Sequence, residues 1–158
     1  MPIAHFSLPY SSLLEATAFY LAALKPLGYE LFLALENQVV LKLKYGGPDF
    51  WLHTAPTDQK GNVIKSAGLH VAFTGGSQKA VREWWEAALK AGGKDNGAPG
   101  ERPQYPKGYY CAYVFDLEGN NIECAYYQPL WLSAFQLAPS VLGATVVGAL
   151  AWWIARRE

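Results

Sequence analysis

An internal repeat constrains the fold of this chain more than any other feature of its sequence. Shifting the sequence by 65 residues places His5 on His70 and Gly28 on Gly93, with no gap between them. Two further stretches match in the same register: Phe19-Tyr20 with Trp84-Trp85, and residues 23–25 with residues 88–90. Because a strand, a helix and a glycine stop all match, the chain is predicted to contain two copies of one supersecondary unit.

The first copy is predicted to be a strand, a helix and three further strands. The first strand is expected at residues 3–8. Ser12 stands three residues before Glu15, which is capping-box spacing, and apolar residues at helical period continue to about residue 24. Turn residues then separate three expected strands, at 29–35, 38–45 and 49–54. The polar stretch 56–66 is expected to link the two copies.

The second copy repeats this order with a longer connection. A strand is expected at 67–74, and a helix runs from the N-cap Ser77 to about residue 90. Residues 95–107 are rich in Gly and Pro and are expected to form an irregular loop. Closing strands are expected at 108–115 and 120–127. The prediction is an α+β fold: residues 1–127 form two tandem βαβββ modules, about 1–55 and 67–127, whose curved mixed sheet surrounds a cleft.

Composition excludes several classes of function. The chain has 13 Lys and Arg against 13 Asp and Glu, with no basic stripe, so no nucleic-acid partner is expected. Two cysteines, Cys111 and Cys124, make no disulfide framework and are expected to be buried free thiols. The N-terminus lacks the basic and apolar regions of a signal peptide, so a cytoplasmic setting is expected.

Three residues stand out as candidate metal ligands. Glu123 is a lone carboxylate in an apolar run, and burying it is costly unless it is paired or bound to a metal. His5 and His70 occupy equivalent places on the first strand of each copy, and these strands are expected side by side. Two imidazoles and a carboxylate suit Fe(II), Mn(II), Ni(II) or Zn(II). An outward-facing Glu and two core histidines are the alternatives.

Four neighbours are candidates for the rest of a site. Trp51 holds the position in the first copy that corresponds to Glu123, so one site with three ligands is expected. His53 lies two residues further on the same strand face and is a candidate acid–base. Tyr113 could donate a hydrogen bond to a bound oxyanion, and Tyr109 and Trp51 are expected to line the substrate cleft. A surface histidine and packing aromatics are the alternatives.

These residues resemble those of the vicinal oxygen chelate superfamily, which contains glyoxalase I, bleomycin-resistance proteins and extradiol dioxygenases. Residues 116–123 are similar to the signature Asp-Pro-Asp-Gly-Asn-x-Ile-Glu, with Leu117 and Glu118 as departures. The other segments that carry the resemblance are 4–8, 18–20, 27–29, 69–73 and 92–97.

The resemblance implies a metal-dependent enzyme for a small organic substrate with adjacent oxygens. His5, His70 and Glu123 match three ligand positions of the family. Glyoxalase I adds a carboxylate-type ligand where this chain has Trp51. Extradiol dioxygenases have an acid–base His and a Tyr in positions that His53 and Tyr113 resemble, so dioxygenase-like and lyase or isomerase chemistry are both implied. A metal-free, small-molecule sequestering protein of the bleomycin-resistance type is the alternative, and a membrane-tethered scaffold without activity is a third hypothesis.

The C-terminal tail, residues 128–158, follows the resemblance and has a different composition. Residues 128–155 contain no charge, and as a helix 137–155 would be about 28 Å long, close to the hydrocarbon thickness of a bilayer. Trp152, Trp153 and two arginines stand at its end. The tail is therefore predicted to be a hydrophobic, transmembrane helix that tethers the domain to a membrane. The alternative is a helix packed on its own domain or on a second copy of the chain, which makes a homodimer a candidate assembly.

Overall fold

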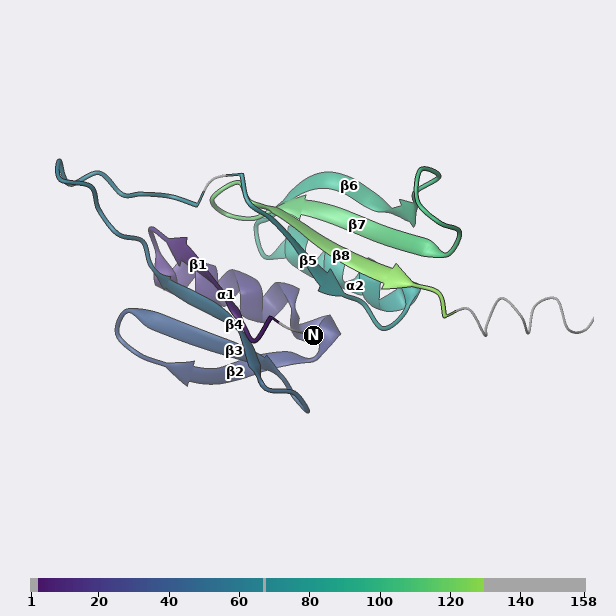
Figure 1. Ribbon diagram of the computed structural model, residues 1–158, viewed down its shortest axis with the longest axis horizontal. Helices are drawn as coiled ribbons and strands as arrows, with labels where there is room; N and C mark the ends of the chain where they lie inside the picture. The colour runs from purple at the N-terminus through teal and green to yellow at the C-terminus, as the bar shows by residue number, and fades with distance from the viewer. Residues whose placement is uncertain (1–2, 67, 130–158) are drawn as a thin grey trace, which may run out of the picture. The chain divides into compact units, whose positions relative to one another are not determined.

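The computed structural model describes residues 3–66 and 68–129, which contain two βαβββ modules (Figure 1). The first module contains β1 (Phe6–Tyr10), α1 (Leu13–Ala23), the 3-10 turn η1 (Lys25–Leu27), β2 (Tyr29–Ala34), β3 (Gln38–Leu43) and β4 (Pro48–Thr54). The second contains β5 (His70–Thr74), α2 (Gln78–Lys90), β6 (Lys94–Glu101), β7 (Tyr109–Phe115) and β8 (Asn121–Tyr127). The predicted α+β fold of two tandem modules is confirmed.

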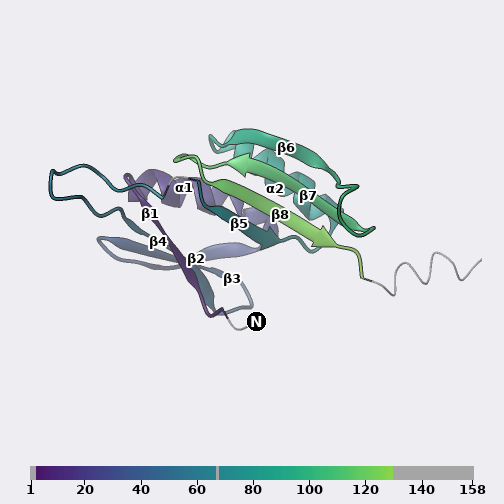
Figure 2. The same cartoon turned by 45° about the horizontal axis from the view of Figure 1, so that its top comes forward.

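Each module forms a four-stranded mixed sheet with the same order of strands. The orders are β1-β4-β3-β2 and β5-β8-β7-β6, and the first strand of each module runs parallel to its last. Figures 1 and 2 show that the helix of each module covers one face of its sheet. The repeated order confirms that the 65-residue repeat encodes one structural unit used twice.

The two helices begin where their serine caps predict. The Ser12 hydroxyl accepts a hydrogen bond from the Glu15 backbone N–H at 3.3 Å, and Ser77 accepts one from Ala80 at 3.1 Å. Each bond satisfies one of the N–H groups that the first helical turn leaves free. The buried side chains recur at helical spacing: Ala16, Phe19, Tyr20 and Ala23 in α1, and Val81, Trp84 and Ala88 in α2.

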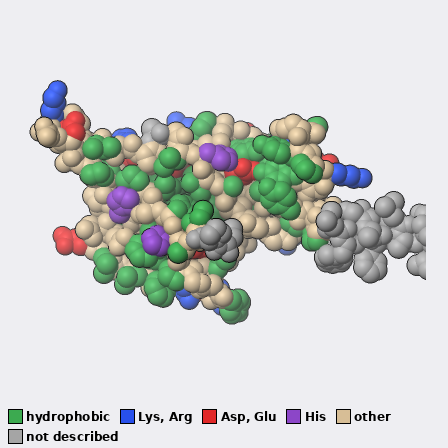
Figure 3. Space-filling model, in the orientation of Figure 1, with side chains coloured by type: hydrophobic (Ala, Val, Ile, Leu, Met, Phe, Trp, Pro, Cys, Tyr) green, Lys and Arg blue, Asp and Glu red, His purple; other side chains and the backbone are tan. Residues whose placement is uncertain are grey.

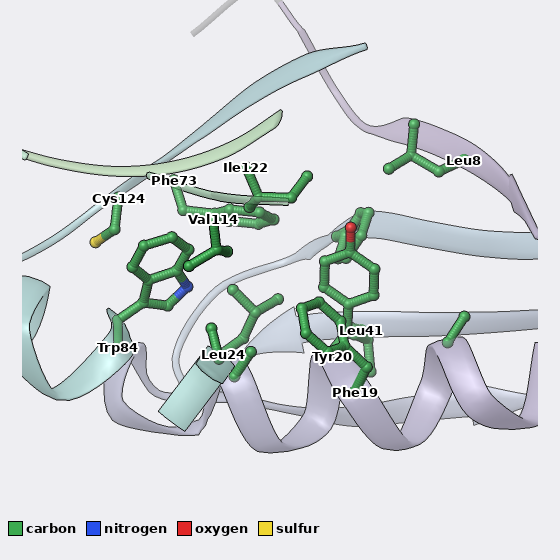
Figure 4. Close-up of a cluster of buried hydrophobic side chains, with 14 of the residues drawn as sticks. Leu8, Phe19, Tyr20, Leu24, Leu41, Phe73, Trp84, Val114, Ile122 and Cys124 are labelled. Atoms are coloured by element: carbon green, nitrogen blue, oxygen red, sulfur yellow. The ribbon is translucent and has the colours of Figure 1, made fainter. Parts of the chain in front are cut away.

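One hydrophobic core contains side chains from both modules (Figure 4). Phe73 of β5 contacts Phe50 of β4, with 5.3 Å between the ring centroids. It also contacts Phe6 of β1 and Tyr29 of β2, at 6.0 and 5.6 Å. Because aromatic side chains bury the largest areas, these contacts stabilise the packing of one module on the other.

A buried carboxylate adds a polar connection between the modules. Asp116, at the turn before β8, accepts hydrogen bonds from the hydroxyls of Tyr10 and Tyr20 in the first module. Its other oxygen accepts from the backbone N–H groups of Glu118 and Asn120, both at 2.9 Å. Burial, together with the charge of Asp116, raises the pKa of Tyr10 and of Tyr20. Asp116 therefore anchors the signature turn to the first module.

The loop prediction for residues 95–107 is wrong in its first half. Lys94–Glu101 form β6, an edge strand that pairs with β7. The pairing is interrupted around Gly97, which has a φ of +153°. Glycine and proline are depleted in regular strands but are tolerated at bulges and edges, which is why this strand has the composition of a loop. Cys111 and Cys124 are buried free thiols, as predicted.

The prediction of a transmembrane helix is also corrected. Within the described residues, α1 and α2 have 11 and 13 residues, and no helix is both long and apolar enough to span a membrane. The hydrophobic helix predicted at 137–155 lies outside the described residues. The transmembrane helix is therefore withdrawn, and the described residues do not show a membrane tether.

Candidate active site

The face of the second sheet opposite α2 carries the candidate site. In β8, Ile122 and Cys124 point into the core, so the residues between and beside them lie on the opposite face. The same alternation in β7 places three side chains on that face: Tyr109, Cys111 and Tyr113. Burial raises the pKa of Cys111, so this thiol stays protonated at neutral pH.

Glu123 is the centre of this face. It is only 4% exposed, and each of its carboxylate oxygens has a partner. The Tyr109 hydroxyl donates to Oε1, and the His70 Nε2 lies 3.0 Å from Oε2. Burial and the neighbouring Glu123 charge raise the pKa of Tyr109, so this hydroxyl remains a donor. The carboxylate is therefore held in one orientation from two sides.

A chain of amides orients the His70 ring. Asn96 Nδ2 donates to Asn121 Oδ1 at 3.0 Å, and Asn121 Nδ2 lies 2.7 Å from His70 Nδ1. In this arrangement Asn121 donates to Nδ1, so Nε2 carries the hydrogen and donates to Glu123. Rotating both amides by 180° would place the hydrogen on Nδ1 and turn the Nε2 lone pair toward Glu123. The orientation of the Asn96 and Asn121 amides is thus linked to the tautomer of His70.

The structure brings together two of the three predicted metal ligands. Metal–ligand bonds of about 2.0–2.2 Å place adjacent donors about 3 Å apart, which is the separation of the His70 and Glu123 donor atoms. His5 precedes β1, is exposed, and stacks on Trp51 with 4.5 Å between ring centroids. In residues 3–66 and 68–129, no group of three or more His, Cys, Asp and Glu is arranged to hold a metal ion. Figure 3 shows the histidines as separate patches on one face.

The strand registers agree with the correspondence between Trp51 and Glu123. Trp51 lies opposite Ser7 in the first sheet, and Glu123 lies opposite Ala72 in the second. Ser7 and Ala72 are themselves related by the 65-residue repeat. In each module, the histidine that begins or precedes the first strand contacts the side chain at this position. The first module therefore repeats the geometry of the site with an indole in place of the carboxylate.

The two predicted catalytic residues lie in different modules. The His53 Nδ1 lies 2.7 Å from the Ser7 hydroxyl, and no hydrogen bond within the described part of the chain joins His53 to Glu123. The Tyr113 ring lies 6.2 Å from the His70 ring, between centroids. Burial, the Cys111 thiol and the Glu123 charge raise the pKa of Tyr113. Tyr113 therefore lies beside the His70–Glu123 pair, whereas His53 contacts the first sheet.

Sequence reasoning missed the residues that support the pair. Tyr109 was expected only to line a cleft, but its hydroxyl donates to Glu123. Period-two alternation from Tyr113 places Tyr109 on the same face, and this was the available signal. Nothing in the sequence indicated the amide chain through Asn96, because that residue was assigned to a loop.

Comparison with solved structures places this geometry in a known fold. A glyoxalase/bleomycin resistance protein from Albidiferax ferrireducens T118 matches at 22% identity and a TM-score of 0.64, covering 80% of this chain and 98% of that one. Lactoylglutathione lyase from Agrobacterium tumefaciens matches at 22% identity, with a TM-score of 0.56 and coverages of 78% and 92%. TioX from Micromonospora sp. ML1 matches at 18% identity, with a TM-score of 0.58 and coverages of 81% and 100%.

The sequence itself matches no protein-family profile and no curated protein. At these identities the structural likeness establishes the fold. The chain has the fold of these glyoxalase/bleomycin resistance proteins, which is the fold that the sequence resemblance implied.

Proposed function

We propose that this chain is a metal-dependent enzyme of the vicinal oxygen chelate type, acting on a small organic substrate with adjacent oxygens. The observation that supports this function is the His70–Glu123 pair, whose donor atoms lie 3.0 Å apart on the face opposite α2. A divalent ion, Fe(II), Mn(II), Ni(II) or Zn(II), would polarise the substrate oxygens as a Lewis acid. Dioxygenase-like and lyase or isomerase reactions are both compatible with this donor set.

The neighbouring residues would position the ligands and handle protons. Tyr109 holds the Glu123 carboxylate, and Asn121 sets the hydrogen on the His70 ring. Because the pKa of Tyr113 is raised, its hydroxyl stays protonated at neutral pH and would donate to a developing oxyanion rather than act as a base. His53 would serve as the acid–base, with its Nδ1 held by Ser7.

A second copy of the chain would supply the third ligand, His5. In one chain His5 contacts Trp51 instead of His70 or Glu123. An exposed apolar stretch on the edge strand β2 supports an assembly of two chains, because such strands are usually covered. Phe32, Leu33 and Leu35 in and after this strand are 53%, 43% and 52% exposed. The homodimer is thus part of the proposed function.

A metal-free binding protein is the second candidate. Both ring nitrogens of His70 and both oxygens of Glu123 already have hydrogen-bond partners within the chain. The Trp51 Nε1 is buried and has no hydrogen-bond partner among the described residues, so a bound ligand could accept its hydrogen bond. These features suit sequestration of an aromatic molecule beside Trp51 and His5.

Metal titration of variants separates the two candidates. Isothermal titration calorimetry with Mn(II), Ni(II) and Zn(II) should show one site per chain in the wild type. Glu123→Gln removes a ligand without changing the shape of the side chain, so affinity should fall about 100-fold or more. The exposed Glu83→Gln on α2 is the matched control and should bind as the wild type does. Equal binding by the wild type and Glu123→Gln would favour the metal-free candidate.

A further inference from the structure

A half-buried arginine lies beside the site and has no carboxylate partner among the described residues. Arg102 follows β6, and its guanidinium carbon is 5.3 Å from the centroid of the Tyr113 ring. Its Nη2 donates to the Ala98 carbonyl at 3.0 Å. No ion pair among the described residues involves Arg102. A positioned and partly desolvated cation with no counter-charge is suited to bind an anion.

The backbone of β6 leaves room for this guanidinium. A Cβ atom at Gly100 would lie 3.1 Å from Arg102 Nη1, and one at Gly97 would lie 3.4 Å from Nη2. The Cβ at Gly97 would also lie 3.0 Å from Tyr113 Cδ2. The guanidinium thus packs on two glycines and the Tyr113 ring, which fixes the direction of its remaining donors.

A pocket of about 310 Å³ adjoins Arg102 and shares a wall with the candidate active site. Lys107, Tyr105 and Tyr109 also line it, and the rings of the two tyrosines lie 4.7 Å apart between centroids. The Tyr109 hydroxyl donates to Glu123, so the pocket and the His70–Glu123 pair meet at this residue.

Three charged residues line the pocket: Arg102 and Lys107 are positive, and Glu101 is negative. Glu101 lies opposite Tyr110 in the β6–β7 register, and Tyr110 accepts a hydrogen bond from Arg82 of α2. The lining therefore carries one net positive charge. Arg102 is held in place by the Ala98 carbonyl and the Tyr113 ring.

We propose that this pocket is the subsite for the carboxylate of a small aromatic acid. Arg102 would bind the carboxylate in a bidentate manner, Lys107 would add a second positive charge, and Tyr105 and Tyr109 would contact the ring. The inference rests on the proposed function in one respect: the far end of such a substrate would reach the His70–Glu123 pair past Tyr109. The substrate class is thus an aromatic carboxylate that carries adjacent oxygens.

Calorimetry on the full chain, with metal removed by chelation, tests the subsite with three probes. Benzoate should bind, neutral benzamide should bind at least tenfold more weakly, and phenyl phosphate should bind more weakly than benzoate. Arg102→Gln should weaken benzoate at least tenfold. Arg82→Gln is the matched control, because Arg82 stacks on Tyr110 at 5.9 Å on the other face of β7 and should leave binding unchanged.

Lys107→Gln keeps the test decisive if Arg102→Gln does not fold. Lys107 is exposed, so its loss should leave the fold intact and weaken benzoate about threefold. Equal binding of benzoate and benzamide, no effect of either variant, or tighter binding of phenyl phosphate would overturn the carboxylate subsite. The probes are tested without metal, so the two proposals can fail separately. If the wild type bound no metal, the proposed enzyme would be overturned, but the binding of benzoate to this pocket would still stand.

Discussion

Glu123 illustrates how a buried charge is retained at the candidate site. Removing both partners would leave a carboxylate 4% exposed in a largely apolar sheet face, which is energetically costly. The structure instead supplies Tyr109 to one oxygen and His70 to the other. The contribution of Tyr109 to metal binding can be tested separately from that of the proposed ligands.

Tyr109→Phe should weaken metal binding about 10- to 100-fold, because it removes the hydrogen bond that orients Glu123. Titration with Mn(II) or Zn(II) measures the change. Tyr110→Phe is the control: Tyr110 is the next residue on β7 but interacts with Arg82 on the other face. Equal losses in the two variants would indicate a general effect on β7 and count against the orienting role.

Asp116 stabilises the fold. Its contribution to the free energy of unfolding can be isolated by comparison with Asp58, an exposed aspartate in a similar turn. Asp58 Oδ1 accepts hydrogen bonds from the backbone N–H groups of the second and fourth residues that follow it in the chain. Asp116 Oδ1 accepts the same two bonds in its own turn. Only Asp116 also binds Tyr10 and Tyr20. Asp116→Asn should therefore lower the free energy of unfolding by about 2–4 kcal/mol in urea titration, and Asp58→Asn by much less. Similar losses would mean that the turn, and not the tyrosines, accounts for the effect.

The sequence identified individual residues of the candidate site more reliably than it identified which residues lie next to each other in the fold. Glu123 and His70 stood out because one is a lone carboxylate in an apolar run and the other has a repeat partner. Their contact agrees with the prediction, while the role of the trio as a metal site stays a prediction. His5 was expected beside His70, and in the structure it stacks on Trp51 of its own module. Repeat symmetry shows which residues are equivalent but does not show which side chains meet.

At the scale of elements, β6 shows why composition can mislead. Its sequence, KDNGAPGE, contains two glycines and a proline, yet its backbone pairs with β7. Pairing with a neighbour, which a local sequence does not reveal, overrides weak strand propensity. The other helices and strands were predicted to within a few residues, because caps and apolar periodicity are local signals.

Gly97→Ala tests whether the glycine is required by the strand. The residue has a φ of +153°, and the new Cβ would lie 3.0 Å from the Tyr113 ring. Backbone strain and the contact together should lower the free energy of unfolding by about 1–3 kcal/mol. Gly47→Ala is the control, since nothing lies within 4 Å of its added Cβ. An unchanged unfolding midpoint for Gly97→Ala would contradict the close packing of Arg102 and Tyr113 on β6.

At the scale of the whole domain, the tyrosines at Asp116 predict instability at high pH. Burial raises the pKa of Tyr20 in the folded state, whereas an unfolded tyrosine ionises near pH 10. Above pH 10 the unfolded chain binds fewer protons, so stability should fall by about 1.4 kcal/mol per pH unit for each such tyrosine. Tyr20→Phe should reduce the slope of unfolding free energy against pH. Tyr45→Phe, at a residue 93% exposed, should not change it.

The last prediction concerns the assembly of the metal site across two chains. If His5 of one copy joins His70 and Glu123 of another, His5→Ala and Glu123→Gln each remove one ligand from every site of their own homodimer. In a mixed dimer, one site takes His5 from the Glu123→Gln chain and both other ligands from the His5→Ala chain. That site is intact.

Random mixing of the two variants should therefore restore about one quarter of the wild-type sites. The measurement is metal retained per chain after the mixture is unfolded, refolded and dialysed, with each variant treated alone as the control. Recovery requires ligands from different chains, because no single chain in the mixture carries all three. Two results would contradict this assembly: a mixture that retains no more metal than each variant alone, or a wild type that binds metal and sediments as a monomer. Either result would exclude His5 as a ligand and leave only His70 and Glu123 of the three predicted ligands.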